Sequence, residues 1–159
     1  MRKRLLPVVL LTAGLMCFSE EAARPQDGTV KIFRSLEEAV PQLERPLLLI
    51  FFSLDCPVCW EELFEMRIFL ENNSIPVDLV GICREAEEEL RPFLSKFAFF
   101  YPVVSDRRKA LFRKFRVRLE PFRVILAPDL SILYEDDMGQ DFYLRRDEVK
   151  RWLLLIASR

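Results

Sequence analysis

A run of six apolar residues just before a C-x-x-C motif is the sequence feature that most restricts the fold. Residues 47–52 read LLLIFF, and three residues separate this run from Cys56, the first cysteine of the motif. An apolar run without polar alternation is typical of a strand buried on both faces of a sheet. From Pro57 onward the apolar residues recur at helical spacing. The sequence therefore predicts a buried strand, a cysteine-containing turn and a helix in direct succession.

Segments with strand and helix patterns alternate along the rest of the chain. This alternation, followed by a terminal hairpin and a helix, predicts an α/β fold with a mixed central sheet and helices on both faces. Strand-like segments are expected at 29–33, 47–52, 76–82, 101–104, 122–126 and 131–134, and helices after Ser35, after Pro57 and at 85–97, 107–115 and 147–158.

The N-terminal sequence predicts an export signal. Basic residues at positions 2–4 precede an apolar stretch of 14 residues, 5–18, which is short for a membrane span. An uncleaved anchor and lipid attachment at Cys17 are the alternatives. We expect residues 1–19 to be a signal peptide, residues 20–28 a linker and residues 29–159 a single folded domain.

Histidine is absent from all 159 residues, and its absence excludes several kinds of site. A Ser-His-Asp triad, a Cys-His pair and a His-ligated metal all need an imidazole. Lys and Arg number 24 and Asp and Glu 25, a balance that argues against a nucleic-acid-binding domain. With four cysteines and a single C-x-x-C, the chain cannot complete a four-ligand zinc site by itself. We therefore expect no metal and no cofactor.

The C-x-x-C spacing at the start of a helix suits thiol–disulfide exchange. Cys56 is expected at or near the N-cap and Pro57 at the first helical position, where free N–H groups and the helix dipole favour a thiolate. Cys59 lies one turn further, so its sulfur can form or break a disulfide with Cys56. Cys56 would attack a substrate disulfide and Cys59 would resolve the mixed disulfide. Two buried, inert cysteines and half of a zinc site are the alternative interpretations.

Three stretches resemble the TlpA-like exported branch of the thioredoxin-like superfamily. They read PLLLIFFSLDCPVCWEEL, FLSKFAFFYPVVSDRRKALFRKFRV and LEPFRVILAPDLSIL, within a resemblance over residues 35–157. The resemblance implies a thioredoxin-like fold and a disulfide oxidoreductase that acts on protein thiols and disulfides, with a further redox partner of unknown identity. With the signal peptide it implies the periplasm or cell envelope. No nucleic acid partner is expected, and membrane contact is expected only through the N-terminal signal or anchor.

The resemblance also implies roles for two further residues. Pro121 matches the cis-proline position that lies beside the dithiol, so the Glu120–Pro121 bond would be cis. Glu62 matches the acidic position of the pattern C-x-x-C-x-x-E, where it would tune a thiol pKa and shuttle a proton. An ordinary trans proline and a solvated helix carboxylate are the alternatives. The candidate catalytic residues are Cys56, Cys59, Glu62 and Pro121.

Other residues depart from the family pattern or stay open. Asp55 stands where that family has Trp and would disfavour a thiolate on Cys56, and Trp60 stands where a polar or basic residue is commoner. Cys83 ends a strand that is expected beside residues 47–52. Its thiol is either a third redox group or part of the buried packing. The basic cluster over 107–118 is a solvated helix face or a docking patch for an acidic partner.

Two other functions compete with disulfide exchange. Residues 53–57 (SLDCP) faintly resemble the Thr-x-x-Cys-Pro of peroxiredoxins, although Leu49 stands in place of that family's upstream proline. This similarity suggests a peroxidase. Alternatively, the chain is a non-enzymatic binding module in which Cys56 and Cys59 form a structural disulfide.

Overall fold

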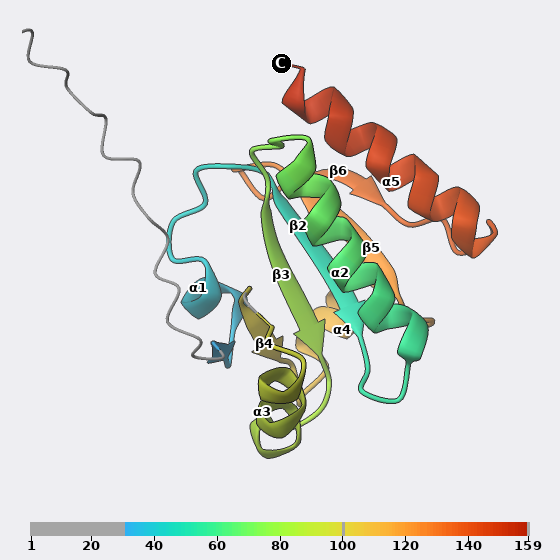
Figure 1. Ribbon diagram of the computed structural model, residues 1–159. Coiled ribbons are helices and arrows are strands. Elements are labelled where there is room, and N and C mark those ends of the chain that lie inside the picture. The colour runs from blue at the N-terminus through green and yellow to red at the C-terminus, as the bar shows by residue number, and fades with distance from the viewer. Residues whose placement is uncertain (1–30, 100, 159) are drawn as a thin grey trace, which may run out of the picture.

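The computed structural model describes residues 31–99 and 101–158, in which five helices pack on a six-stranded sheet (Figure 1). The predicted signal peptide and linker lie outside the described residues. The elements in chain order are β1 (Ile32–Phe33), α1 (Leu36–Ala39), β2 (Leu47–Phe52), α2 (Pro57–Asn72), β3 (Asp78–Cys83), α3 (Glu87–Lys96), β4 (Val103–Ser105), α4 (Ala110–Lys114), β5 (Phe122–Leu126), β6 (Ile132–Glu135) and α5 (Phe142–Ala157).

The sheet has the strand order β1-β4-β3-β2-β5-β6 and is mixed, as predicted. Strands β1, β4, β3 and β2 run parallel, whereas β5 is antiparallel to both β2 and β6. The apolar run 47–52 forms β2 near the centre of this sheet, and all six of its residues are buried. As expected, the run lacks polar alternation because helices cover both faces of the sheet.

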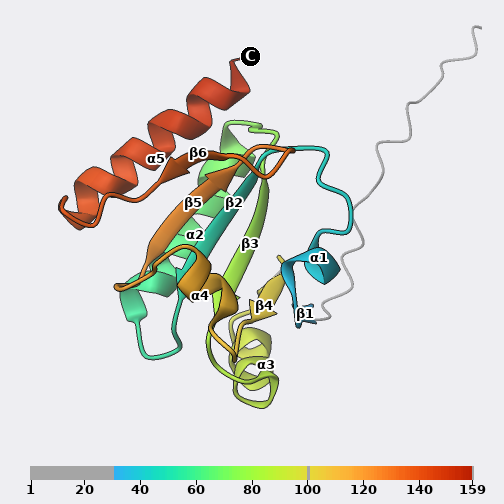
Figure 2. The same cartoon turned by 180° about the vertical axis from the view of Figure 1, so that it is seen from behind.

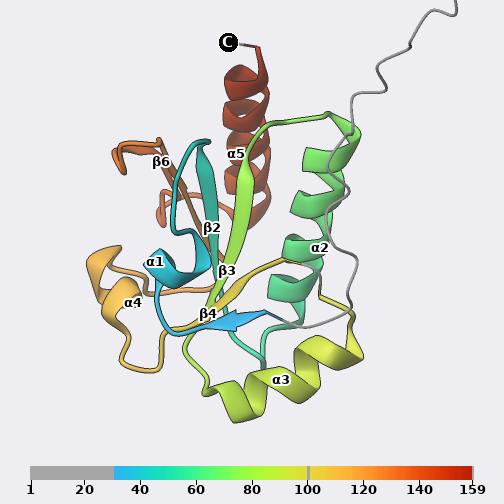
Figure 3. The same cartoon turned by 90° about the vertical axis from the view of Figure 1, so that its left-hand side faces the viewer.

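Two layers of helices enclose the sheet, as Figures 2 and 3 show. The even-numbered residues of β2 belong to a core cluster with α2, α3 and α5. The odd-numbered residues belong to a second cluster, which contains aromatic side chains from and next to α4 and has α1 packed against it. The N-terminal end of α2 and the C-terminal ends of β2 and β3 meet at one edge of this arrangement (Figure 1).

Side-chain caps explain where several helices begin. The Ser35 hydroxyl accepts a hydrogen bond from the Glu38 N–H at 3.2 Å, which starts α1 as predicted. Asp141 caps α5 by accepting from the Tyr143 N–H at 2.9 Å. This cap starts α5 at Phe142, five residues before the start expected from the apolar pattern.

The chain between β4 and β5 also differs from the prediction. A helix was expected over 107–115, but α4 covers only Ala110–Lys114. The buried Asp106 carboxylate accepts hydrogen bonds from the N–H groups of Ala110, Leu111 and Phe112, so the helix starts where these bonds begin.

The helix expected at 85–97 is present as α3. Of the four large apolar residues in that range, Leu90 and Leu94 are buried. Phe93 and Phe97 are half-buried and pack on the ring of Trp60 instead.

No helix within residues 31–99 and 101–158 is long and apolar enough to cross a membrane.

Candidate active site

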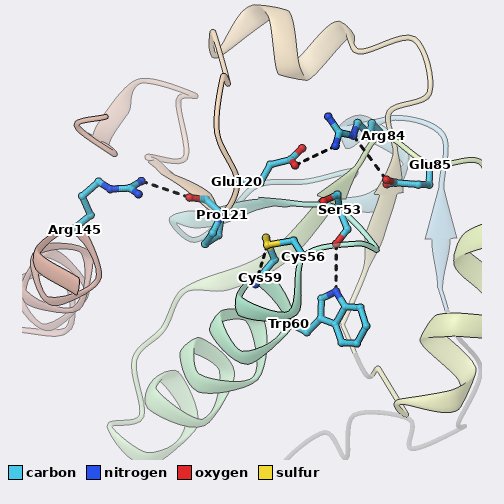
Figure 4. The surroundings of a disulfide bond; sticks show 9 residues. All are labelled: Ser53, Cys56, Cys59, Trp60, Arg84, Glu85, Glu120, Pro121 and Arg145. Atoms are coloured by element: carbon cyan, nitrogen blue, oxygen red, sulfur yellow. Dashed lines mark hydrogen bonds and ion pairs between the residues drawn. A yellow bond between two sulfur atoms is a disulfide. The ribbon is translucent and has the colours of Figure 1, made fainter. Parts of the chain in front are cut away.

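Cys56 and Cys59 form a disulfide at the N-terminus of α2 (Figure 4), with their Cα atoms 5.3 Å apart. Cys56 is the N-cap residue and Pro57 the first residue of the helix, as predicted. The Cys56 sulfur accepts a hydrogen bond from the Cys59 N–H at 3.2 Å. Cys56 is half-buried, whereas Cys59 is fully buried. Of the two cysteines, the one at the helix end is therefore the one that a partner can reach.

Trp60 ties the loop before the motif to the neighbouring helix. Its indole N–H donates to the Ser53 carbonyl oxygen at 3.2 Å, the same oxygen that accepts from the Cys56 N–H. The ring lies 4.3 Å from the ring of Phe93, between centroids. This departure from the family pattern thus has a structural role. Asp55, the other departure, is exposed to solvent.

Pro121 lies among the surroundings of the disulfide, and the Glu120–Pro121 bond is cis, as predicted (Figure 4). Strand β5 begins at Phe122, which is paired with Phe51 of β2. This antiparallel register brings Pro121 to the end of β2 from which the chain continues into the cysteine motif. The Arg145 guanidinium donates to the Pro121 carbonyl oxygen at 3.5 Å.

Glu62 is a buried member of an ion pair, not a solvated helix carboxylate. It follows Cys59 by three residues on α2, which puts the two on the same face of the helix. Its Oε1 accepts from Nε of Arg123 at 2.7 Å, and both side chains are fully buried. Oε2 has no hydrogen-bond partner within the described residues. Burial raises the pKa of the Glu62 carboxyl above its ordinary value, although the Arg123 guanidinium acts in the opposite direction.

The ion pair continues into a network that the sequence analysis did not predict. Arg123 contacts both carboxylate oxygens of Asp136 at 3.2 Å, and Arg145 donates to Asp136 at 3.1 Å. The hydroxyl of Tyr134 donates to the same carboxylate at 2.7 Å. A charged residue inside the otherwise apolar strand FRVIL was the available signal, because a charge in a central strand needs a buried partner.

Cys83 is a free thiol that is fully buried at the end of β3, beside Phe52 of β2. Its S–H donates to the Glu85 carboxylate at 2.6 Å. Burial and this hydrogen bond raise the pKa of the Cys83 thiol, so it stays protonated. These observations favour buried packing over a third redox thiol.

The described residues contain no cluster of three or more His, Cys, Asp or Glu side chains that could hold a metal ion. The chemistry available at this site is that of two cysteines, one half-buried and one buried, with a buried carboxyl group one turn further along the helix.

Comparison with known proteins gives the family and the fold. A sequence model of the AhpC/TSA family matches residues 26–140. No curated protein matches the sequence.

Several solved structures share the fold at low sequence identity. StoA of Bacillus subtilis is 20% identical with a TM-score of 0.55, over 71% of this chain and 85% of that one. The exposed lipoprotein thioredoxin Etrx1 of Streptococcus pneumoniae is 12% identical with a TM-score of 0.58, over 72% and 87%. The peroxidoxin BcpB of Mycobacterium tuberculosis is 20% identical with a TM-score of 0.60, over 72% and 82%. These similarities confirm the predicted thioredoxin-like fold.

Proposed function

The chain belongs to the AhpC/TSA family of thioredoxin-like oxidoreductases, and we propose that it exchanges disulfides with partner proteins through Cys56 and Cys59. The observation that carries this proposal is the bonded pair at the start of α2, in which Cys56 is half-buried and Cys59 is fully buried. A thiolate on Cys56 would be stabilised by the Cys59 N–H, which already faces this sulfur at 3.2 Å, and by the dipole of a 16-residue helix.

The exchange proceeds in two balanced steps. In the reduced protein, the Cys56 thiolate attacks one sulfur of a substrate disulfide, that S–S bond breaks, and one substrate thiolate leaves. Cys59 then loses its proton and attacks the Cys56 sulfur, which releases the second substrate thiol and forms the Cys56–Cys59 disulfide. Two electrons pass to the substrate, and the reverse sequence oxidises a substrate dithiol.

Glu62 is the residue that we propose as the proton acceptor for Cys59. It lies one turn along the same helix, its Oε2 has no partner within the described residues, and its pKa is raised by burial. A carboxyl group with a raised pKa is better matched to proton transfer near neutral pH than an ordinary one. Pro121 would shape the surface on which the substrate lies.

An exported location forms part of the proposal. It rests on the basic and then apolar N-terminal sequence, with the periplasm or cell envelope as the expected destination. Of the similar structures, Etrx1 is described as an exposed lipoprotein. Fusing residues 1–28 to a reporter enzyme that is active only outside the cytoplasm tests this location. A fusion that stays inactive would contradict it.

A redox titration of the full-length chain in glutathione buffers, read by alkylation and peptide mass mapping, tests the exchange function. We expect Cys56 and Cys59 to titrate as one two-electron couple between about −120 and −270 mV. A pair that remains oxidised well below about −300 mV is a structural disulfide, and the binding-module interpretation would replace ours.

A pair of cysteine variants supplies the second test. With a disulfide-bonded model peptide, Cys59→Ser should accumulate a mixed disulfide through Cys56, whereas Cys56→Ser should accumulate none. Hydrogen peroxide consumption is measured in parallel, because a peroxidoxin is among the similar structures. Rapid peroxide consumption without peptide reduction would favour a peroxidase.

A further inference from the structure

The chain between β4 and β5 carries an unusual concentration of positive charge. Residues 107–119 include seven basic residues and no acidic one, in a chain with a formal net charge of −1. All seven basic side chains are exposed. None of them forms an ion pair with any residue that the structure describes. No ion pair in the described part of the molecule offsets their mutual repulsion, although Lys114 interacts electrostatically with the Glu37 carboxylate.

Part of this surface is hollow. A pocket of about 360 Å³ is lined by five basic residues around an apolar pair. The lining residues are Arg84, Lys109, Phe112, Arg113, Arg116, Val117 and Arg118.

Three acidic residues close to this stretch of the chain already have partners of their own. The Asp106 carboxylate is buried under α4, where it accepts three backbone N–H groups. Glu120 and Glu85 are largely buried and both pair with Arg84. Arg84 is thus paired, whereas the other four basic lining residues form no ion pair with a described carboxylate.

One lining residue of the pocket, Arg84, lies in the surroundings of the disulfide (Figure 4). Arg84 directly follows β3 and pairs with Glu120 at 3.4 Å. Glu120 is bonded to Pro121, and all three residues belong to the surroundings of the Cys56–Cys59 disulfide (Figure 4). A peptide lying across Pro121 could thus extend toward the pocket.

We propose that this basic pocket binds an acidic segment of the protein whose disulfide is exchanged at Cys56, which rests on the function proposed above. Four of its five basic residues are Arg. The planar guanidinium forms paired hydrogen bonds with a carboxylate, a geometry that Lys does not offer. The apolar lining residues Phe112 and Val117 suit the methylene groups of Glu side chains. The pocket thereby selects substrates with carboxylates close to their exchanging cysteine.

The binding arm of the test uses no exchange chemistry. Fluorescein-labelled hexaglutamate and hexaglutamine are titrated against the Cys56→Ser/Cys59→Ser protein, and binding is read by anisotropy. Hexaglutamate should bind, with an affinity that falls steeply as ionic strength rises, and hexaglutamine should not. Arg113→Gln/Arg118→Gln in that background should weaken hexaglutamate binding about tenfold.

The control variant is Arg45→Gln/Arg151→Gln, which changes the net charge equally at two exposed positions outside the pocket. It should bind hexaglutamate as the parent protein does. Equal weakening in both double variants would overturn the proposal, because it would reflect net charge alone. Binding to vesicles of anionic lipid in the absence of hexaglutamate binding would also overturn it.

The kinetic arm compares the reduction of two disulfide peptides that differ only in an acidic or a neutral flank. The ratio of their second-order rate constants should favour the acidic peptide and fall about tenfold in Arg113→Gln/Arg118→Gln. A ratio of one in the parent protein would overturn the selectivity. Hexaglutamate binding with no reduction of either peptide would instead refute the exchange function while the binding of acidic segments by the basic pocket stands.

Discussion

Glu62 connects the chemistry of α2 to the charge balance of the core. Removal from water disfavours its carboxylate, whereas the Arg123 guanidinium at 2.7 Å favours it. The first effect is larger, so the pKa is raised, and the folded protein holds this proton more tightly than the unfolded chain does. The stabilisation that follows is complete below the ordinary pKa of 4.5 and is lost as the pH rises through the raised value.

Replacement of Glu62 tests this balance at the level of one residue. For Glu62→Gln, we expect the stability difference from the parent protein to be larger at pH 4 than at pH 7, because the raised pKa makes the folded parent bind this proton more tightly than the unfolded chain. Urea denaturation of the oxidised proteins at both pH values measures the difference. If the parent's advantage instead grows toward pH 7, then the ion pair outweighs burial and the pKa of Glu62 is lowered.

At the level of the elements, the buried charges connect parts of the fold that lie far apart in sequence. Arg123 belongs to β5, Asp136 directly follows β6, and Arg145 is in the first turns of α5. Arg145 also reaches the Pro121 carbonyl. One carboxylate thus holds together two guanidinium groups and, through them, the first strand of the β5–β6 hairpin and the helix that follows it.

Loss of the Asp136 charge should be costly for this reason. In Asp136→Asn, two buried guanidinium groups remain but only one buried carboxylate, that of Glu62, is left to balance their charge. We therefore expect a loss of about 3–5 kcal/mol in the free energy of unfolding. Glu135→Gln is the matched control, since its side chain is exposed one residue earlier, and it should change stability by less than about 0.5 kcal/mol. Similar losses in chemical denaturation for both variants would mean that the network does not stabilise the fold.

Across the whole molecule, α5 closes the face of the sheet that also carries α2. Val149 and Leu153 of α5 are fully buried in the same core cluster as Cys59 and Leu63. The helix that follows the hairpin therefore shares its packing with the helix that bears the cysteine motif (Figure 3). A defect in α5 should be felt by the entire fold.

Alanine substitutions at two neighbouring leucines of α5 test whether this helix belongs to the shared core. Leu153→Ala should lower the free energy of unfolding by about 2–5 kcal/mol because it opens a cavity in the common cluster. Leu154, which is 45% exposed, should tolerate alanine with a change below about 0.5 kcal/mol. Denaturation followed by circular dichroism provides the measurement. A small effect at Leu153 would mean that α5 adds little to the stability of the core.

Local signals in the sequence are enough to identify the elements around the motif. The apolar run 47–52, the C-x-x-C spacing and Pro57 identify a buried strand that leads into a helix N-terminus, because each signal depends on residues only a few positions apart. The resemblance supplied the cis bond before Pro121, which no local pattern predicts. The apolar pattern did not predict where α5 begins, because the capping side chain of Asp141 decides that position.

The residues that surround the motif come from distant parts of the chain, which folding brings together. The partner of Glu62 lies 61 residues away on β5, and Arg84 lines a pocket with residues that follow it by 25 or more positions. Such contacts depend on the strand order and register of the sheet, which bring distant segments together. Periodicity and spacing report which face a side chain occupies but not which charge it meets there. The burial of Glu62 and the place of Arg84, both in the lining of the basic pocket and in the surroundings of the disulfide, could therefore be known only once the chain was folded.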